Sequence, residues 1–174
     1  MEKGKLKEQS KYLLCLLIYI FLVSCASKIN REYFSNTLGL NINIEKKTFD
    51  SSDAVSQHGE GFTIEAYTFK NIKNKNILKN KSSYPVTYDI RKAWKISKWS
   101  KTPLSNKDVE NLLFTYAIND DKIKMQLQKI QEVLSSTDNY FSYYYKDNEG
   151  EIYAVDISII DTKNKIIYLC EVIT

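Results

Sequence analysis

A short apolar run near the start divides this chain of 174 residues into two unlike parts. Residues 12–23 read YLLCLLIYIFLV and follow a lysine-rich start, residues 1–11. As a helix, this run would be about 18 Å long, whereas the hydrocarbon core of a bilayer is about 30 Å thick. The run is therefore too short to span a membrane comfortably. It is typical of the apolar part of an export signal, whose positive flank stays in the cytoplasm.

The residues that close the run predict what happens to this leader. Leu22-Val23-Ser24-Cys25 resembles the lipobox of bacterial lipoproteins, in which an aliphatic residue and two smaller ones precede a cysteine. In that family the thiol receives a diacylglyceryl group, a peptidase cuts before the cysteine, and the freed amine is often acylated, with palmitate as a typical chain. Two acyl chains anchor a protein stably where one does not. The resemblance implies that residues 1–24 are a cleaved signal peptide and that Cys25 is lipidated.

The same resemblance predicts where the protein resides. We expect it to be exported and lipid-anchored to the cell membrane through Cys25. Ala26 and Ser27 follow the cysteine and no aspartate does, so in a cell with two membranes the outer membrane is also a destination. The alternative is an uncleaved membrane anchor or cleavage elsewhere, but no A-x-A site precedes Ala26.

The part after the leader has the composition of a folded domain. The chain is 43% hydrophobic and 13% aromatic, whereas disordered chains are poor in both classes. The formal net charge is +4, and the four lysines and two glutamates of residues 1–11 account for half of it. No basic block resembles a nucleic-acid footprint, so we expect no nucleic-acid partner.

One stretch of the mature chain is nevertheless rich in lysine. Residues 70–81 hold Lys70, Lys73, Lys75, Lys79 and Lys81. Two interpretations stay open for them, a solvated loop and a patch that rests on anionic lipid.

Patterning predicts a tether, residues 25–38, and a single globular α+β domain, residues 39–174. Leu40, Ile42 and Ile44 alternate with polar residues, which is typical of a half-buried strand. Residues 46–60 read as a loop. A second strand follows from Gly61, with Phe62 and Ile64 on one face and Tyr67 on the other, which is compatible with burial on both faces. Residues 71–104 give no clear pattern, and their structure stays open.

Two helices are predicted after Pro103. Ser105 is a candidate N-cap for the first, in which Val109, Leu112 and Leu113 share a face. The second runs from about residue 120 to 134, because its apolar residues recur at helical spacing and make one stripe. The members of that stripe are Ile123, Leu127, Ile130 and Leu134.

The end of the chain predicts three strands joined by short polar turns. The strands are residues 140–145, 152–160 and 166–173, and the turns are residues 147–150 and 161–164. Short turns make antiparallel neighbours. We therefore expect an α+β fold in which an antiparallel sheet ends in a three-strand meander and about two helices pack on one face.

The densest polar cluster lies just before the second strand. It consists of Asp50, Asp53, His58 and Glu60. Imidazole and carboxylate together suit a metal ion or an acid–base pair. A single histidine matches no metal motif, however, and Gly59 and Gly61 more simply allow a sharp entry into the strand. We assign no catalytic residue, metal site or cofactor, and keep these residues as a weak candidate site.

The mature chain also resembles small uncharacterised exported proteins of Gram-positive bacteria. In those proteins a loop rich in Asp, His and Gly precedes a strand, a Trp-x-x-x-Pro-Leu segment precedes a helix, and an aromatic hairpin ends in a tyrosine-containing strand. The residues that carry the resemblance are Asp53, His58, Gly59, Gly61, Trp99, Pro103, Leu104 and the stretch from Phe141 to Thr174. The resemblance implies no activity.

Nucleophilic catalysis finds no support, because no Gly-x-Ser-x-Gly elbow occurs. Cys170 lies in an apolar strand pattern and is most simply a small buried hydrophobic residue. Two interpretations stay open for the tyrosines of the last strands. They present an aromatic face that binds a peptide or glycan, or the alternation of the strands buries half of them. The leading hypothesis is a non-enzymatic binding domain at the cell envelope, with a protein, peptide or glycan partner. The alternatives are an envelope hydrolase or metal-dependent enzyme that uses His58, and an immunity-type lipoprotein.

Overall fold

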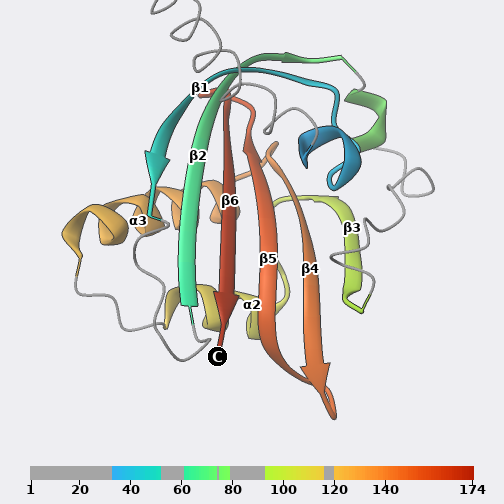
Figure 1. The fold of residues 1–174 in the computed structure, drawn as a ribbon, viewed down its shortest axis with the longest axis vertical. Helices are drawn as coiled ribbons and strands as arrows, with labels where there is room; N and C mark the ends of the chain where they lie inside the picture. Colours follow the sequence, from blue (N-terminus) through green and yellow to red (C-terminus); the bar gives the residue numbers. More distant parts are fainter. Residues whose placement is uncertain (1–32, 52–60, 74, 79–92, 116–119) are drawn as a thin grey trace, which may run out of the picture.

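The computed structural model describes residues 33–51, 61–73, 75–78, 93–115 and 120–174. These residues form a mostly antiparallel six-stranded sheet in the order β1-β2-β6-β5-β4-β3, with helices beside it (Figure 1). Every described strand pair is antiparallel. The elements are β1 (Ile42–Asp50), β2 (Gly61–Ile72), the 3-10 helix η2 (Lys75–Leu78), β3 (Lys95–Lys101), α2 (Lys107–Phe114), α3 (Asp121–Ser135), β4 (Tyr140–Asn148), β5 (Glu151–Asp161) and β6 (Ile166–Ile173).

The predicted C-terminal meander is confirmed only in part. Strands β4, β5 and β6 lie side by side in chain order. They do not form a separate unit, however, because β6 also pairs with β2 and β4 also pairs with β3. The last strand is therefore an interior strand of a larger sheet.

Helices α2 and α3 cover one face of the sheet, which we call the helix face (Figure 1). Alternate residues of each strand point to this face, as the period of two requires. Ile64 of β2, Ile157 of β5 and Val172 of β6 pack there against Leu113 of α2 and Ile130 of α3, and all five are fully buried. Burying a side chain of this size contributes roughly 1.5–3 kcal/mol to stability.

The first described residues cover part of the opposite face, which we call the front face. Residues 33–36 form a helical turn, and the ring of Phe34 meets that of Tyr67 edge-on, with centroids 5.4 Å apart. The indole nitrogen of Trp99 donates to the carbonyl of Leu38 at 3.2 Å. Residues 33–38, which we placed in the tether from their mixed composition, thus pack on the sheet.

Two local predictions were wrong. Strand β1 continues to Asp50, where we expected a loop from residue 46, because its backbone pairs with β2 through several register shifts. Helix α2 is capped by Asn106 rather than Ser105, since the side-chain oxygen of Asn106 accepts from the backbone N–H groups of Asp108 and Val109. Helix α3 lies where its apolar stripe predicted.

The structure also answers part of what the sequence left undecided about residues 71–104 and about the tyrosines of the last strands. Of residues 71–104, the structure describes the end of β2, η2 and β3, while residues 74 and 79–92 lie outside the described residues. Tyr143 and Tyr168 are buried on the helix face and Tyr144 on the front face, so both faces bury tyrosines, whereas Tyr153 is exposed. No helix in the described part of the chain is both long and apolar enough to cross a bilayer.

Candidate functional site

The structure describes only one member of the predicted polar cluster. Asp50 ends β1, whereas Asp53, His58 and Glu60 lie outside the described residues, as does the predicted lipidation site Cys25. Within the described ranges, no group of three or more His, Cys, Asp or Glu side chains is placed to hold a metal ion. A metal or catalytic role for His58 therefore stays a prediction.

Asp50 belongs to an ion-pair network at the edge of the sheet. The ammonium group of Lys47 lies 2.7 Å from a carboxylate oxygen of Asp50 and 2.6 Å from one of Glu65. The hydroxyl of Tyr67 donates to the other oxygen of Glu65 at 2.6 Å. Partial burial acts to lower the pKa of Lys47, but the two carboxylates outweigh it and raise this pKa. Lys47 thus stays charged and joins β1 to β2.

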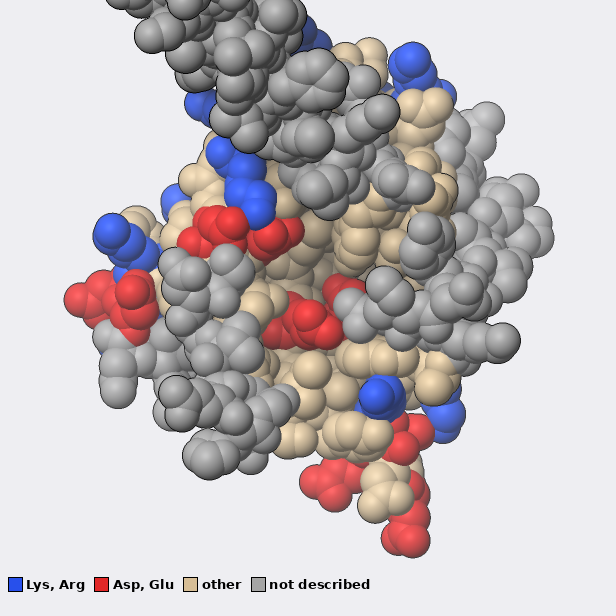
Figure 2. Space-filling view, in the orientation of Figure 1, with Lys and Arg blue, Asp and Glu red and all other residues tan. Residues whose placement is uncertain are grey.

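Two further carboxylates lie in the middle of the front face. Asp156 of β5 and Glu171 of β6 are cross-strand partners, and Asp156 is only 4% exposed. Figure 2 shows acidic side chains over the middle of this face. Asp156 and Glu171 each have an interaction partner, so we assign no ligand to them.

A pocket of about 650 Å³ lies at one end of the sheet, where β2 leaves it and β5 turns into β6. Its volume lies within the range of small-molecule sites. Phe69, Ile72, Leu78, Tyr140 and Ile160 supply its apolar and aromatic lining. The polar part of the lining comes from Lys70, Asn71, Lys75, Asp138, Thr162 and Lys165.

Strand register assembles lysines around this pocket. Thr68 pairs with Ile166, and the backbone N–H of Phe69 donates to the carbonyl of Lys165 at 3.0 Å. The chain after Phe69 therefore lies beside the turn between β5 and β6. We call five exposed lysines at this end the lysine rim. Lys70, Lys75 and Lys165 line the pocket, and Lys73 and Lys163 each lie two positions from one of them in the chain.

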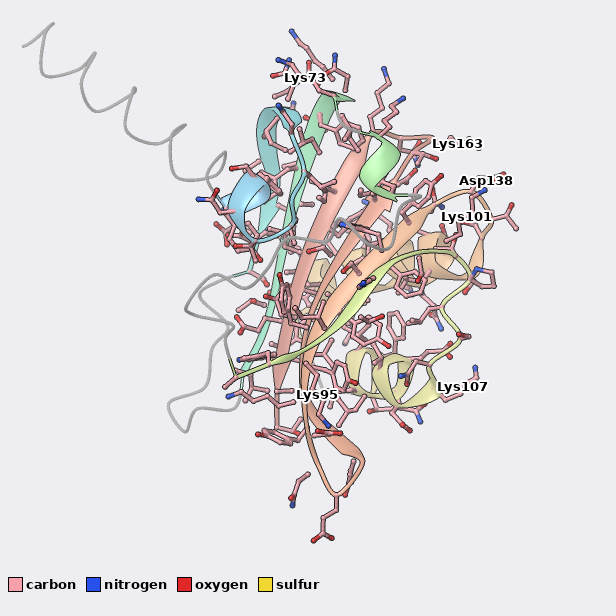
Figure 3. The ribbon with its side chains drawn as sticks, turned by 90° about the vertical axis from the view of Figure 1, so that its right-hand side faces the viewer. Lys73, Lys95, Lys101, Lys107, Asp138 and Lys163 are labelled. Carbon is pink, nitrogen blue, oxygen red and sulfur yellow. The ribbon has the colours of Figure 1, made fainter. Side chains whose placement is uncertain are left out.

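Few acidic side chains offset the lysine rim among the described residues at this end. Asp138 lies 3.3 Å from Lys101, which it neutralises. Asp161 is buried and accepts from the backbone N–H and the side-chain amide of Asn164, so it holds the turn. Figure 3 shows Lys73, Lys163, Lys101 and Asp138 at the same end of the sheet. The rim is thus cationic.

Acidic side chains gather at the opposite end of the sheet. Asp147, Glu149 and Glu151 lie in or beside the turn between β4 and β5, which projects at the bottom of Figure 2. Lys95 pairs with Asp147 at 2.6 Å, and this contact raises the pKa of Lys95. Glu149 and Glu151 are exposed. Lys146, whose ammonium group lies 5.0 Å from the centre of the Trp94 ring, is also at this end, so two lysines face three carboxylates here. The described domain is therefore more negative at this end than at the lysine rim.

Cys170 is not placed to act as a nucleophile at this pocket. The described cysteine, Cys170, is 1% exposed and lies on the helix face, and burial raises its pKa. A thiol that a substrate cannot reach, and that stays protonated, is a poor nucleophile. Lysine ammonium groups around an apolar cavity suit an anionic group attached to an apolar one.

Sequence reasoning found three of the five members of the lysine rim. The stretch of residues 70–81 signals Lys70, Lys73 and Lys75, whereas Lys163 appeared only as part of the turn 161–164 and Lys165 in no predicted element. The pairing of β2 with β6 could have indicated the whole rim, but no local pattern predicts which strands become neighbours.

Comparisons of the chain with models of protein families, with curated proteins and with solved structures gave no match. The function is therefore argued from the residues and the geometry alone. The two resemblances, of the leader and of the mature chain, stay predictions.

Proposed function

We propose that this protein is an envelope lipoprotein, exported by residues 1–24 and held to a membrane by acyl groups on Cys25. The observation that carries the proposal is the sequence Leu22-Val23-Ser24-Cys25, placed directly after an apolar run and a lysine-rich start. The described part of the chain is in keeping with it, because the first buried residue in that part, Phe34, lies only nine positions after the cysteine. A folded domain that starts so close to a lipidated residue is held near the membrane surface.

The domain acts in this proposal as a non-enzymatic binding module, with about two helices packed on one face of its sheet. The pocket inside the lysine rim supplies the site, because it is concave, partly apolar and cationic. Its chemistry favours an anionic partner over a cationic or neutral one.

Metabolic labelling of cells with an alkyne analogue of palmitate tests the anchor. The wild-type protein should take up the label, and the N-terminal peptide of the mature protein should start at a doubly or triply acylated Cys25. The Cys25→Ser variant should take up no label, and its mass should still include the uncleaved leader. Cys15→Ser is the matched control and should behave as wild type, since Cys15 leaves with the leader.

An unlabelled wild-type protein would contradict the proposal. So would a Cys25→Ser variant that matches the wild type in size and in its distribution between membrane and soluble fractions.

A further inference from the structure

The charges of the described domain are separated along its long axis. Five exposed lysines form the rim at one end, and Glu149 and Glu151 are exposed at the other. A negatively charged surface attracts the first end and repels the second, so it orients the whole domain. The rim therefore has an electrostatic preference for one class of surface.

The chain enters the domain at the same end. The backbone N–H of Lys73 donates to the carbonyl of Asn41 at 2.8 Å, so the segment that starts at Tyr33 joins β1 beside the lysine rim. Figure 1 shows this segment, in blue, over the upper half of the sheet. The part of the chain before Tyr33 thus joins the domain at the half that carries the lysine rim.

The length of that connection limits which end can meet the membrane. Tyr33 is eight positions after Cys25, a span of at most about 28 Å at roughly 3.5 Å per residue. The 12 residues of β2 extend for about 40 Å at 3.3 Å per residue. Because the tether is shorter than the sheet, the lysine end reaches the bilayer more readily than the acidic end.

The pocket adds a place for part of a lipid. Lysine side chains carry charge on flexible apolar stems, and those of Lys70, Lys75 and Lys165 surround the apolar residues Ile72 and Leu78. A phosphate group with its glycerol backbone matches a cationic rim over an apolar floor. A fully hydrophilic polyanion would leave that floor unused.

We infer that the lysine rim docks the domain onto anionic phospholipids of the membrane that carries its anchor. This inference rests on the proposed anchoring through Cys25. Docking fixes the orientation of the domain, with the rim against the bilayer and the β4–β5 turn directed away from it.

Amine footprinting tests the docking with the protein as cells produce it. The purified chain is reconstituted into vesicles of phosphatidylcholine with or without phosphatidylglycerol, labelled with an amine-reactive reagent, and analysed by peptide mass spectrometry. Labelling of Lys73 and Lys163 should fall several-fold on anionic vesicles relative to neutral ones. Labelling of Lys107 and Lys124, on the helices, should not change. Salt at about 0.5 M should restore labelling, because screening then acts over roughly 4 Å.

A pair of variants with equal charge loss separates the rim from net charge. The first replaces the five rim lysines with glutamine, and the second replaces Lys98, Lys107, Lys122, Lys124 and Lys129 with glutamine. Lys101, which lies beside the rim and is exposed, stays in both and serves as the reporter. Anionic vesicles should protect it in the second variant and not in the first.

Equal labelling of Lys73 and Lys163 on the two vesicle types would overturn the inference. Protection on neutral vesicles by added glycerol phosphate would also overturn it, in favour of a soluble anion. Protection on neutral vesicles only after addition of an envelope protein fraction would assign the rim to a protein partner instead. The N-terminal mass of the same samples decides the anchor separately, since an uncleaved leader would also hold the chain in the vesicles.

Discussion

The hydroxyl of Tyr144 in β4 donates a hydrogen bond of 2.6 Å to the backbone carbonyl of Thr37, a residue 107 positions earlier in the chain. Tyr144 is fully buried on the front face. The bond fastens the first described segment to β4, the neighbour of edge strand β3, and complements the contact of Trp99 in β3 with Leu38. The segment that begins at Tyr33 is thereby part of the folded domain.

Loss of this bond should weaken the fold without leaving a large cavity. Tyr144→Phe removes the donor and leaves a buried carbonyl short of a partner, so we expect a loss of about 1–3 kcal/mol in the free energy of unfolding. Urea denaturation measures it. Tyr153→Phe is the control, because Tyr153 is 38% exposed, and it should stay close to wild type. Equal effects of the two substitutions would contradict this role of Tyr144.

The helix face should depend on α3 through its buried stripe. Ile130 of α3 is completely buried, so Ile130→Ala should cost about 2–5 kcal/mol through lost burial and a residual cavity. Met125 of the same helix is 50% exposed, and Met125→Ala should cost much less. Thermal denaturation of both variants tests the packing. Similar melting temperatures for the two would mean that α3 does not pack on this face.

Stability should fall in alkali through Tyr168. Burial, with Asp161 nearby, raises the pKa of Tyr168 to about 12 from an ordinary value of 10. Between these values the unfolded chain binds fewer protons than the folded one, so stability decreases as pH rises. The stability contributed by Tyr168 is complete below about pH 10 and is lost towards pH 12, a change of at most about 2–3 kcal/mol.

Comparison with Tyr168→Phe isolates this contribution. The variant lacks the titrating hydroxyl, so its free energy of unfolding, measured in urea, should fall less steeply with pH across that window than in wild type. Parallel pH profiles would show that Tyr168 ionises as readily in the folded chain as in the unfolded one.

Thiol titration should report both the fold and the anchor. Cys170 is buried with a raised pKa, so it should resist alkylation at neutral pH in the native protein and react once urea unfolds it. If Cys15 is removed with the leader and Cys25 is acylated, one thiol per unfolded chain should react. A native protein that alkylates rapidly at Cys170 would refute its burial, whereas three reactive thiols after unfolding would refute the processing.

Local patterns predicted much of the secondary structure. Alternation in β2 assigned Phe62 and Ile64 to one face and Tyr67 to the other, and the structure places them in separate clusters. The apolar stripe of α3 and the buried state of Cys170 are confirmed as well. These features depend on periods of 2 and 3.6 residues, which neighbouring residues in the sequence display directly.

The sequence by itself determined which faces of the strands and helices are apolar, and it carries the motif on which the proposed anchor depends. Only the tertiary structure decided that Lys70 and Lys165 share one rim, and that Phe34 belongs to the core instead of the tether. The reason is physical, because periodicity fixes the face that a side chain takes, while strand order and register arise from contacts between segments far apart in the chain.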